Sequence, residues 1–463
     1  MNFLFGPVGK MARNATFPYA LQVLMLLVFA YLVITGWGVG NDVSDMSYLK
    51  ILRKTNSSTL LIWGIWWPLM IIGVVALGRV WCTVCPMELV NNLTHRVSSR
   101  LGLSRVSLPA WLRAGYLIFL LYLALQLLVG GISLHRVPGF TSYMLIAILA
   151  LAAISGVVFK EPRSFCKGFC PANLLLSVYG RFSPVQLDTL APGVCRSCRS
   201  RDCMRADALK KWNGQSCASR VPAFDREQGD ACVLCFQCVK ACPHDNVGFG
   251  ITTGQSPARR RPVLTVAESL FVILASGFIT HEVFTEIKPM EWIFHWPVER
   301  FYSWAGVAIS WDWVHTFWYL FLFPLALWFL ILGIIRLFEH RNSFWELLTM
   351  AATSAAPIIA TAHVAKALAK LNSWAGFLPM SLAQPGGIPN ADSIFNKTLA
   401  APGLVVPYQL VGIIVIVLIL LGSIFALREL RKIPNGTLIP SRISVLVIGL
   451  MYTAVFAFWP FIH

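Results

Sequence analysis

Nine apolar runs, each about as long as a membrane crossing, follow one another along the chain and are separated by short polar segments. A helix needs about 20 apolar residues to cross a bilayer core of roughly 30 Å. The pattern predicts transmembrane helices at residues 18–37, 58–78, 111–132, 142–159, 263–281, 313–336, 345–370, 407–427 and 442–460. It therefore predicts an all-α polytopic membrane protein with about nine transmembrane helices.

Composition agrees with a membrane protein, and the placement of charge predicts its orientation. The chain is 57% hydrophobic and 13% charged, whereas a soluble domain is about 25% charged. With the N-terminus inside, the excess positive charge of +17 falls on the inner segments, as the positive-inside rule requires. The positive charge then reports topology and contact with membrane lipid, and we expect no nucleic-acid partner.

These observations predict a multi-pass protein of a prokaryotic cytoplasmic membrane. The first run follows a short head with Lys10 and Arg13, and no small-residue cleavage site comes after it. We therefore expect a retained anchor rather than a signal peptide. The N-terminus is expected in the cytoplasm and the C-terminus, residues 459–463, outside.

An internal repeat ends each half of the first four runs. The second run leads into RVWCTVCP and the fourth into RSFCKGFCP, so that Arg79 matches Arg163 and Cys85 matches Cys170. Each copy then consists of two helices, a Cys-Pro corner and a return along the inner surface. A duplicated membrane unit commonly places a functional site between its copies.

The sequence thus divides into three expected parts. Residues 1–180 form the duplicated four-helix unit, residues 181–262 form a cysteine-rich insert, and residues 263–463 form a five-helix membrane module without cysteine. The insert is expected on the cytoplasmic side.

The strongest motif lies in the insert. Four cysteines and a proline have the spacing Cys-x₂-Cys-x₂-Cys-x₃-Cys-Pro: Cys232, Cys235, Cys238, Cys242 and Pro243. In this bacterial ferredoxin run, three thiolates hold one [4Fe–4S] cluster and the fourth holds the neighbouring cluster. Structural zinc does not require this spacing, and cytoplasmic thiols stay reduced, which disfavours disulfides. The insert is therefore predicted to be a two-cluster ferredoxin-like domain.

The second cluster is expected from cysteines earlier in the insert: Cys195, Cys198, Cys203 and Cys217. By analogy with two-cluster ferredoxins, Cys242 joins the first three of these in one cluster. Cys217 then joins Cys232, Cys235 and Cys238 in the other. The spacing of the earlier group departs from the simple pattern, so Cys217 can alternatively close the cluster of its own motif. The same eight ligands serve both assignments.

The remaining four cysteines lie at the two corners: Cys82, Cys85, Cys166 and Cys170. Three interpretations stay open. The four thiolates can hold a further iron centre or another soft metal. Each pair can be a redox dithiol. Alternatively, the Cys-Pro corners only shape the chain, since buried cysteine behaves as a small hydrophobe.

Two Cys-Pro corners after paired spans, followed by a two-cluster cysteine motif, resemble the NapH/NosR-type membrane polyferredoxins, with the CcoG group as a relative. The resemblance covers roughly residues 15–255, so the last five runs lie outside it. It implies clusters that relay electrons between the membrane quinol pool, or a membrane partner, and a respiratory redox enzyme or its maturation system.

Ionisable residues occur in the last five runs, where such groups are costly. His281 ends the fifth run, His315 begins the sixth, and His363 and Lys366 lie one turn apart in the seventh. Two histidines that face each other can ligate a haem b, or a histidine and a lysine can bind a quinone and manage its protons. The alternative is helix packing, with the lysine reaching the interface.

The patterns together predict a membrane-bound electron-transfer subunit. It relays electrons between the quinone pool or a membrane partner and a redox enzyme through two [4Fe–4S] clusters, in a complex with other redox subunits. The alternatives are a CcoG-like metal reductase or assembly factor and a scaffold whose clusters only hold the insert together. No Cys-x-x-Cys-His, Walker A or Rossmann motif is present, and whether the chain is itself an enzyme stays open.

Overall fold

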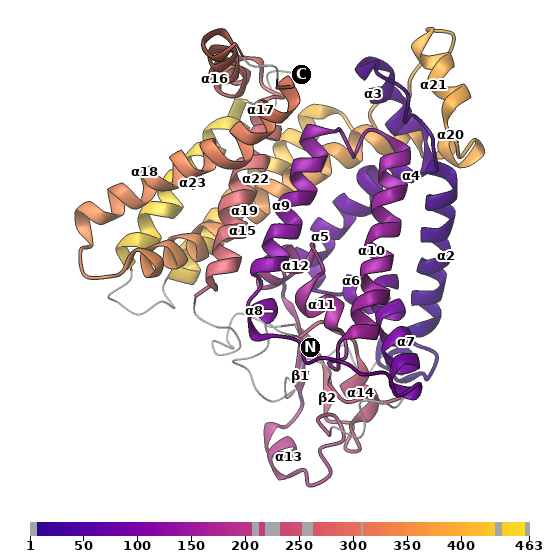
Figure 1. The fold of residues 1–463 in the computed structure, drawn as a ribbon. Coiled ribbons are helices and arrows are strands. Elements are labelled where there is room, and N and C mark those ends of the chain that lie inside the picture. Colours follow the sequence, from indigo (N-terminus) through magenta and orange to yellow (C-terminus); the bar gives the residue numbers. More distant parts are fainter. Residues whose placement is uncertain are drawn as a thin grey trace. The chain divides into compact units, whose positions relative to one another are not determined.

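Helices dominate the computed structural model, which describes residues 7–205, 213–217, 232–251, 263–306, 309–430 and 438–458 (Figure 1). Within these ranges, 8 helical segments are long and apolar enough to cross a membrane: Tyr19–Gly36, Ser57–Leu77, Pro138–Val158, Val266–Phe284, Trp311–Phe338, Phe344–Ala383, Tyr408–Arg428 and Ile439–Phe456. They confirm a multi-pass membrane protein. The expected outer location of the C-terminus falls on residues 459–463, which lie outside the described residues.

Several spans combine consecutive helical segments. The first and third long spans are single helices, α2 (Tyr19–Gly36) and α10 (Pro138–Val158). Three further spans are also single helices: α15 (Val266–Phe284), α22 (Tyr408–Leu430) and α23 (Leu438–Phe458). The other three combine consecutive segments: α4 (Ser57–Thr59), η2 (Leu60–Trp66) and α5 (Trp67–Leu77); α17 (Trp311–Phe317), η5 (Trp318–Leu322) and α18 (Phe323–Phe338); and α19 (Phe344–Trp374), η6 (Ala375–Phe377) and α20 (Leu378–Ala383).

The span predicted at residues 111–132 is a shorter helix than the apolar pattern indicates. α9 (Tyr116–Gly131) has 16 residues, which corresponds to about 24 Å at 1.5 Å per residue. The preceding α8 (Ala110–Arg113) is separate because Gly115 adopts a left-handed φ of 88°. A left-handed residue interrupts a right-handed helix, and glycine tolerates that conformation.

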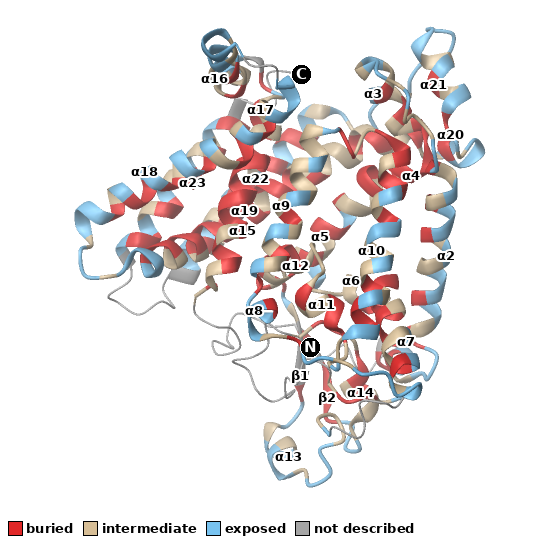
Figure 2. Ribbon diagram, in the orientation of Figure 1, coloured by how far each residue is buried: buried red, intermediate tan, exposed pale blue. Residues whose placement is uncertain are grey.

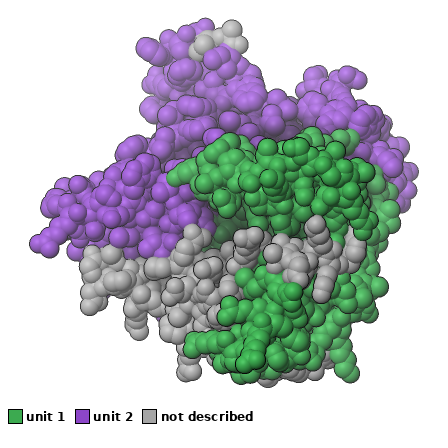
Figure 3. Space-filling model, turned by 60° about the horizontal axis from the view of Figure 1, so that its bottom comes forward, with its two compact units in different colours: residues 1–31, 73–118, 145–262 green, residues 32–72, 119–144, 263–463 purple. Residues whose placement is uncertain are grey.

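The chain forms two compact units (Figure 3). Unit 1 comprises residues 1–31, 73–118 and 145–262, and unit 2 comprises residues 32–72, 119–144 and 263–463. The helices α2, α5, α9 and α10 contribute residues to both. The boundaries predicted at residues 180 and 262 remain a prediction.

Unit 1 contains the two Cys-Pro corners. In the first, α5 leads into α6 (Trp81–Val84) and α7 (Pro86–Arg100); in the second, α10 leads into α11 (Ser164–Gly168) and α12 (Asn173–Gly180). Pro86 is the first residue of α7. Proline is favourable there because the first N–H groups of a helix have no acceptor within the helix, so the N–H that proline lacks costs no hydrogen bond. The repeat read from the sequence therefore corresponds to a repeated order of helices.

The described part of the insert contains a small sheet and two short helices. β1 (Val185–Thr189) pairs antiparallel with β2 (Val247–Ile251), with Val185 opposite Ile251. The helices are α13 (Pro192–Ser197) and α14 (Gln237–Ala241). The likeness of this insert to a ferredoxin remains a prediction.

Unit 2 is built around α19, which packs against α15, α22 and α23. Small side chains line α19, among them Ala355, Ala356 and Ala362, and they are fully or nearly fully buried. Small residues let membrane helices approach closely. Figure 2 shows buried positions concentrated along α15 and α19, whereas α18 and α22 also present exposed apolar side chains, as lipid-facing helices do. The remaining helices of unit 2 are α3 (Met46–Thr55), α16 (Lys288–Ala305) and α21 (Ile388–Phe395).

Candidate functional site

The two corners bring their four cysteines into one region of unit 1. Cys82 lies in α6, Cys85 precedes α7, and Cys166 lies in α11. Burial raises the pKa of Cys166 well above its ordinary value, and the neighbouring Cys170 and Cys85 raise it further. Burial, followed by the nearby Cys82, likewise raises the pKa of Cys170 to about 12. Like charges act in this way only at short range, so the corner thiols are neighbours.

The corner thiols are also the predicted ligands of a further metal centre. Across the described ranges, no three His, Cys, Asp or Glu side chains are placed to hold a single metal ion. A [4Fe–4S] cluster differs, because its four cysteines bind different iron atoms and so stand farther apart. A further metal centre at the corners therefore remains a prediction.

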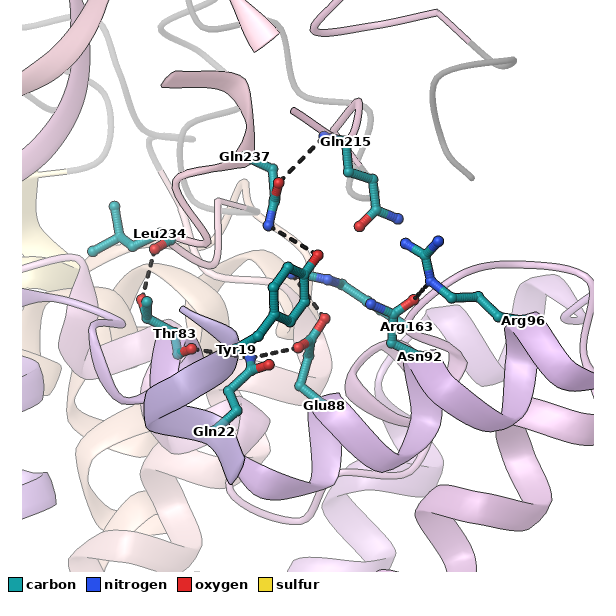
Figure 4. Close-up of polar contacts among 10 residues, drawn as sticks. All are labelled: Tyr19, Gln22, Thr83, Glu88, Asn92, Arg96, Arg163, Gln215, Leu234 and Gln237. Carbon is teal, nitrogen blue, oxygen red and sulfur yellow. Dashed lines mark hydrogen bonds and ion pairs between the residues drawn. The ribbon is translucent and has the colours of Figure 1, made fainter. Parts of the chain in front are cut away.

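A buried ion pair joins the two copies of the repeat. Arg163, just before α11, places Nη2 2.9 Å from Oε1 of Glu88 in α7, and the two side chains are only 8% and 4% exposed. Gln22 donates through Nε2 to the other carboxylate oxygen of Glu88 at 2.6 Å and to the carbonyl of Thr83 at 3.0 Å (Figure 4). Breaking one side of such a pair leaves an uncompensated buried charge. The network therefore holds the two corners together.

The first corner also contacts the insert directly. Thr83, between Cys82 and Cys85, donates its Oγ1 to the carbonyl of Leu234 at 2.7 Å. Leu234 lies inside the Cys232–Cys242 motif, so one cysteine loop is hydrogen-bonded to another (Figure 4). A second bond runs from Gln237 Nε2 in α14 to the hydroxyl of Tyr19 at 3.3 Å.

Cys195, Cys198, Cys203 and Cys242 form one group of insert cysteines. Burial, followed by the other three thiols of the group, raises the pKa of Cys203 to about 11. Asn246 donates to two of them, from Nδ2 to Cys195 Sγ at 3.1 Å and from its backbone N–H to Cys242 Sγ at 3.4 Å. Hydrogen bonds donated to a sulfur favour its thiolate form.

Cys217, Cys232, Cys235 and Cys238 form the other group. Burial raises the pKa of Cys238 well above its ordinary value, followed by Cys235, Cys232, Cys217 and, as the smallest of these, Cys203 of the first group. Cys217 thus lies with the cysteines of the later motif. Its backbone N–H also bonds to the carbonyl of Cys203 in the first group, at 2.7 Å. The crossed grouping expected by analogy with two-cluster ferredoxins, and the clusters themselves, remain a prediction.

Left-handed backbone is concentrated in the cysteine loops. Of the seven described non-glycine residues with positive φ, five lie in or beside a cysteine motif: Arg163, Arg201, Leu234, Phe236 and Asp245. Each such conformation costs about 1–2 kcal/mol. Alternation of left- and right-handed residues turns successive N–H groups inward, which forms the anion-binding concavities found at many Fe–S sites. Such strain typically clusters at functional sites.

A cavity of about 670 Å³ lies within unit 2 and includes two of the three predicted histidines. The rings of His281 and His315 are 4.9 Å apart, and His281 stacks on Tyr319 at 4.1 Å. His295 from α16 joins them, 5.3 Å from His315. Lys366 also lines this cavity and forms an ion pair with Glu282.

His363 lies apart from this group. It is 2% exposed, packs against Phe278 at 5.5 Å and lines a smaller adjoining cavity of about 50 Å³. The expected convergence therefore holds for His281, His315 and Lys366 but not for His363.

The histidine pair does not fit a haem. Metal–nitrogen bonds to histidine are about 2 Å long, so two axial rings on one iron have centroids roughly 6 Å apart with a macrocycle between them. His281 and His315 are closer, at 4.9 Å, with their planes inclined by 71°. No porphyrin fits between these two rings.

Sequence reasoning missed four polar residues of these sites: Gln22, Glu88, Asn246 and His295. Gln22 could have been identified from the sequence, because a polar residue inside an apolar run usually faces the protein interior and pairs with another polar group. His295 lies in an aromatic segment whose composition is that of an interfacial belt. The only sequence feature that points to Asn246 is its position four residues after Cys242. Their roles follow from contacts between distant segments.

No family model and no solved structure matches this chain. Two relatives from Methanocaldococcus jannaschii are similar to part of it, and both are described as uncharacterized proteins. MJ0749 is 28% identical over 180 residues, which covers 38% of this chain and 66% of the relative. MJ0750 is 23% identical over 195 residues, which covers 39% and 75%, respectively.

Proposed function

We propose that the chain is a membrane-bound electron-transfer subunit that relays electrons between the quinone pool, or a membrane partner, and a redox enzyme through two [4Fe–4S] clusters in the insert. The observation that supports this most directly is the gathering of eight insert cysteines into two groups of four, in loops with left-handed backbone. A bound cubane supplies one-electron transfer.

The two groups have different surroundings, which suggests a role for each. α13, which carries Cys195, has no buried residue, and Cys198 has a pKa lowered to about 7 by hydrogen bonds from Ser200 and the backbone of Arg201. The other group includes Leu234 in its loop and so adjoins the first corner through Thr83. We therefore assign the group that includes α13 to exchange with another redox subunit and the group beside the first corner to exchange with the membrane part.

The insert is proposed to face the cytoplasm. Gln255 lies outside the described residues. A protease site placed beside it should be cut by added protease in inverted vesicles, which expose the cytoplasmic face, and not in right-side-out vesicles. A matched site beside Gly403, in an exposed loop between α21 and α22, should be cut only from the opposite side. The reverse pattern would invert the positive-inside assignment.

The histidine-lined wall of the unit 2 cavity is proposed as the quinone site. We expect His281→Ala to slow quinol-driven reduction of the clusters by about 100-fold, because it removes a group positioned to exchange a proton. His363→Ala is the matched control and should change the rate far less, since His363 does not line the large cavity. Stopped-flow absorbance measures both rates; equal rates in the two variants would remove His281 from the quinone site.

A CcoG-like metal reductase or assembly factor is the second candidate. It is favoured by the grouping of the corner thiols and by the hydrogen bond from Thr83 to the insert. Metal analysis after Cys82→Ser with Cys166→Ser separates the two functions: loss of a bound metal while both cluster signals remain supports this candidate, and unchanged metal content removes it.

A further inference from the structure

Four cationic side chains also line the unit 2 cavity. We call Arg53, Lys54, Arg136 and Lys370 the cation cluster. They come from three segments: α3, the turn between α9 and α10, and α19. Three of them surround the ring of Trp374, with Lys370 Nζ 4.9 Å, Arg53 Cζ 5.0 Å and Lys54 Nζ 6.0 Å from its centroid.

The cation cluster forms no ion pair with a carboxylate of the described chain, and Glu286 and Asp312 act on it only at longer range. Among the residues that the structure describes, no carboxylate lies within 4 Å of any of its four members, whereas Lys366 and His295 in the same cavity pair with Glu282 and Glu291. The other two lining acids, Glu286 and Asp312, are exposed to solvent. The Nε atoms of Arg53 and Arg136 are buried and have no hydrogen-bond partner in the described chain.

The nearest histidine does not neutralise these charges. His135 lies 3.5 Å from Arg53 Nη1 and hydrogen-bonds through Nδ1 to the carbonyl of Val129 at 3.1 Å. Burial, followed by the charge of Arg53, lowers the pKa of His135 well below its usual value. Burial likewise lowers the pKa of Arg53, to about 10, which leaves the guanidinium charged at neutral pH.

We propose that the cation cluster binds an oxyanion, the phosphate or carboxylate group of an organic molecule whose remainder occupies the cavity. Guanidinium groups bind such oxygens in a bidentate way, and an anion here supplies the partners that the buried Nε atoms lack. Cavities of 300–1,000 Å³ hold drug-sized molecules, so about 670 Å³ exceeds what an inorganic anion needs. This inference does not depend on the proposed redox function.

The anion has two sources, a lipid headgroup or a soluble molecule, and the test separates them. The intact protein is placed in nanodiscs of phosphatidylcholine and titrated calorimetrically with sn-glycerol 3-phosphate or succinate. In parallel, nanodiscs containing phosphatidylglycerol are analysed by native mass spectrometry for retained lipid. Binding in either arm supports the oxyanion site and identifies its source.

Arg53→Met is expected to raise the dissociation constant at least 10-fold, or to abolish lipid retention, while Arg53→Lys keeps part of the affinity. Arg300→Met is the matched control, because Arg300 also lies over a tryptophan, 5.8 Å from the Trp296 ring centroid, but does not line the cavity. If Arg53→Met does not fold, Lys370→Met carries the same test. Equal binding by the parent and the cation-cluster variants, or no binding in either arm, overturns the proposal.

Discussion

Replacing Cys235 with Ser should remove about half of the iron from the purified protein. Two cubanes predict about eight irons and eight acid-labile sulfides per chain, and Cys235 belongs to the group with Cys217, Cys232 and Cys238. Its loss removes one ligand of that cluster and leaves the other group intact. Iron and sulfide analysis after anaerobic purification measures the content, and low-temperature electron paramagnetic resonance distinguishes the two clusters.

Cys195→Ser is the matched variant for the other group. It should remove the other cluster signal and spare the one that Cys235→Ser removes, since Cys195 lies with Cys242 and Asn246. The crossed grouping adds a sharper test, because Cys217→Ser should resemble Cys235→Ser rather than Cys195→Ser. Zinc in place of iron in the parent protein would refute the cluster assignment altogether.

Arg163→Met should destabilise the protein by about 3–5 kcal/mol, because it leaves the carboxylate of Glu88 buried without its counter-charge. Glu88→Gln should also destabilise, and the double variant should lose less than the sum of the two single losses. Thermal and denaturant unfolding in detergent, followed by circular dichroism, measures these differences. The left-handed backbone at residue 163 is occupied by a non-glycine residue in both proteins, so its strain largely cancels.

The surface pair of Arg13 with Asp245 is the control for this prediction. Its atoms are also 2.9 Å apart, but the side chains are 34% and 66% exposed. Exposed pairs contribute about 0–1 kcal/mol, so Arg13→Met should change stability little. If Arg163→Met and Arg13→Met have equal effects, the buried pair does not hold the corners together.

The oxyanion and quinone proposals concern different lining residues of one cavity, and their variants separate them. Arg53→Met should change anion binding and leave the ring contacts of His281 with His315 and Tyr319 in place. His281→Ala should do the reverse. A variant at either residue that changes both readouts equally would indicate a single shared ligand.

The apolar pattern alone determined that this is a multi-pass membrane protein, because a transmembrane helix is a local property of about 20 consecutive residues. It placed eight long spans near their observed positions. It overestimated α9, since an apolar run does not reveal that Gly115 takes a left-handed conformation that starts the helix later. Spacing also singled out all 12 cysteines as candidate ligands, because cysteine motifs are local in sequence.

Tertiary structure decided which distant residues meet. Cys217 lies with the later motif and Thr83 bonds to Leu234 across 151 positions of sequence, and spacing encodes neither contact. His363 and Lys366 share a helix face in sequence, yet the packing of α19 places only Lys366 at the large cavity. The cation cluster joins three segments that no motif connects. Ligand motifs can be recognised from neighbouring residues in the sequence, whereas a buried charge and its partners are brought together only by the packing of helices.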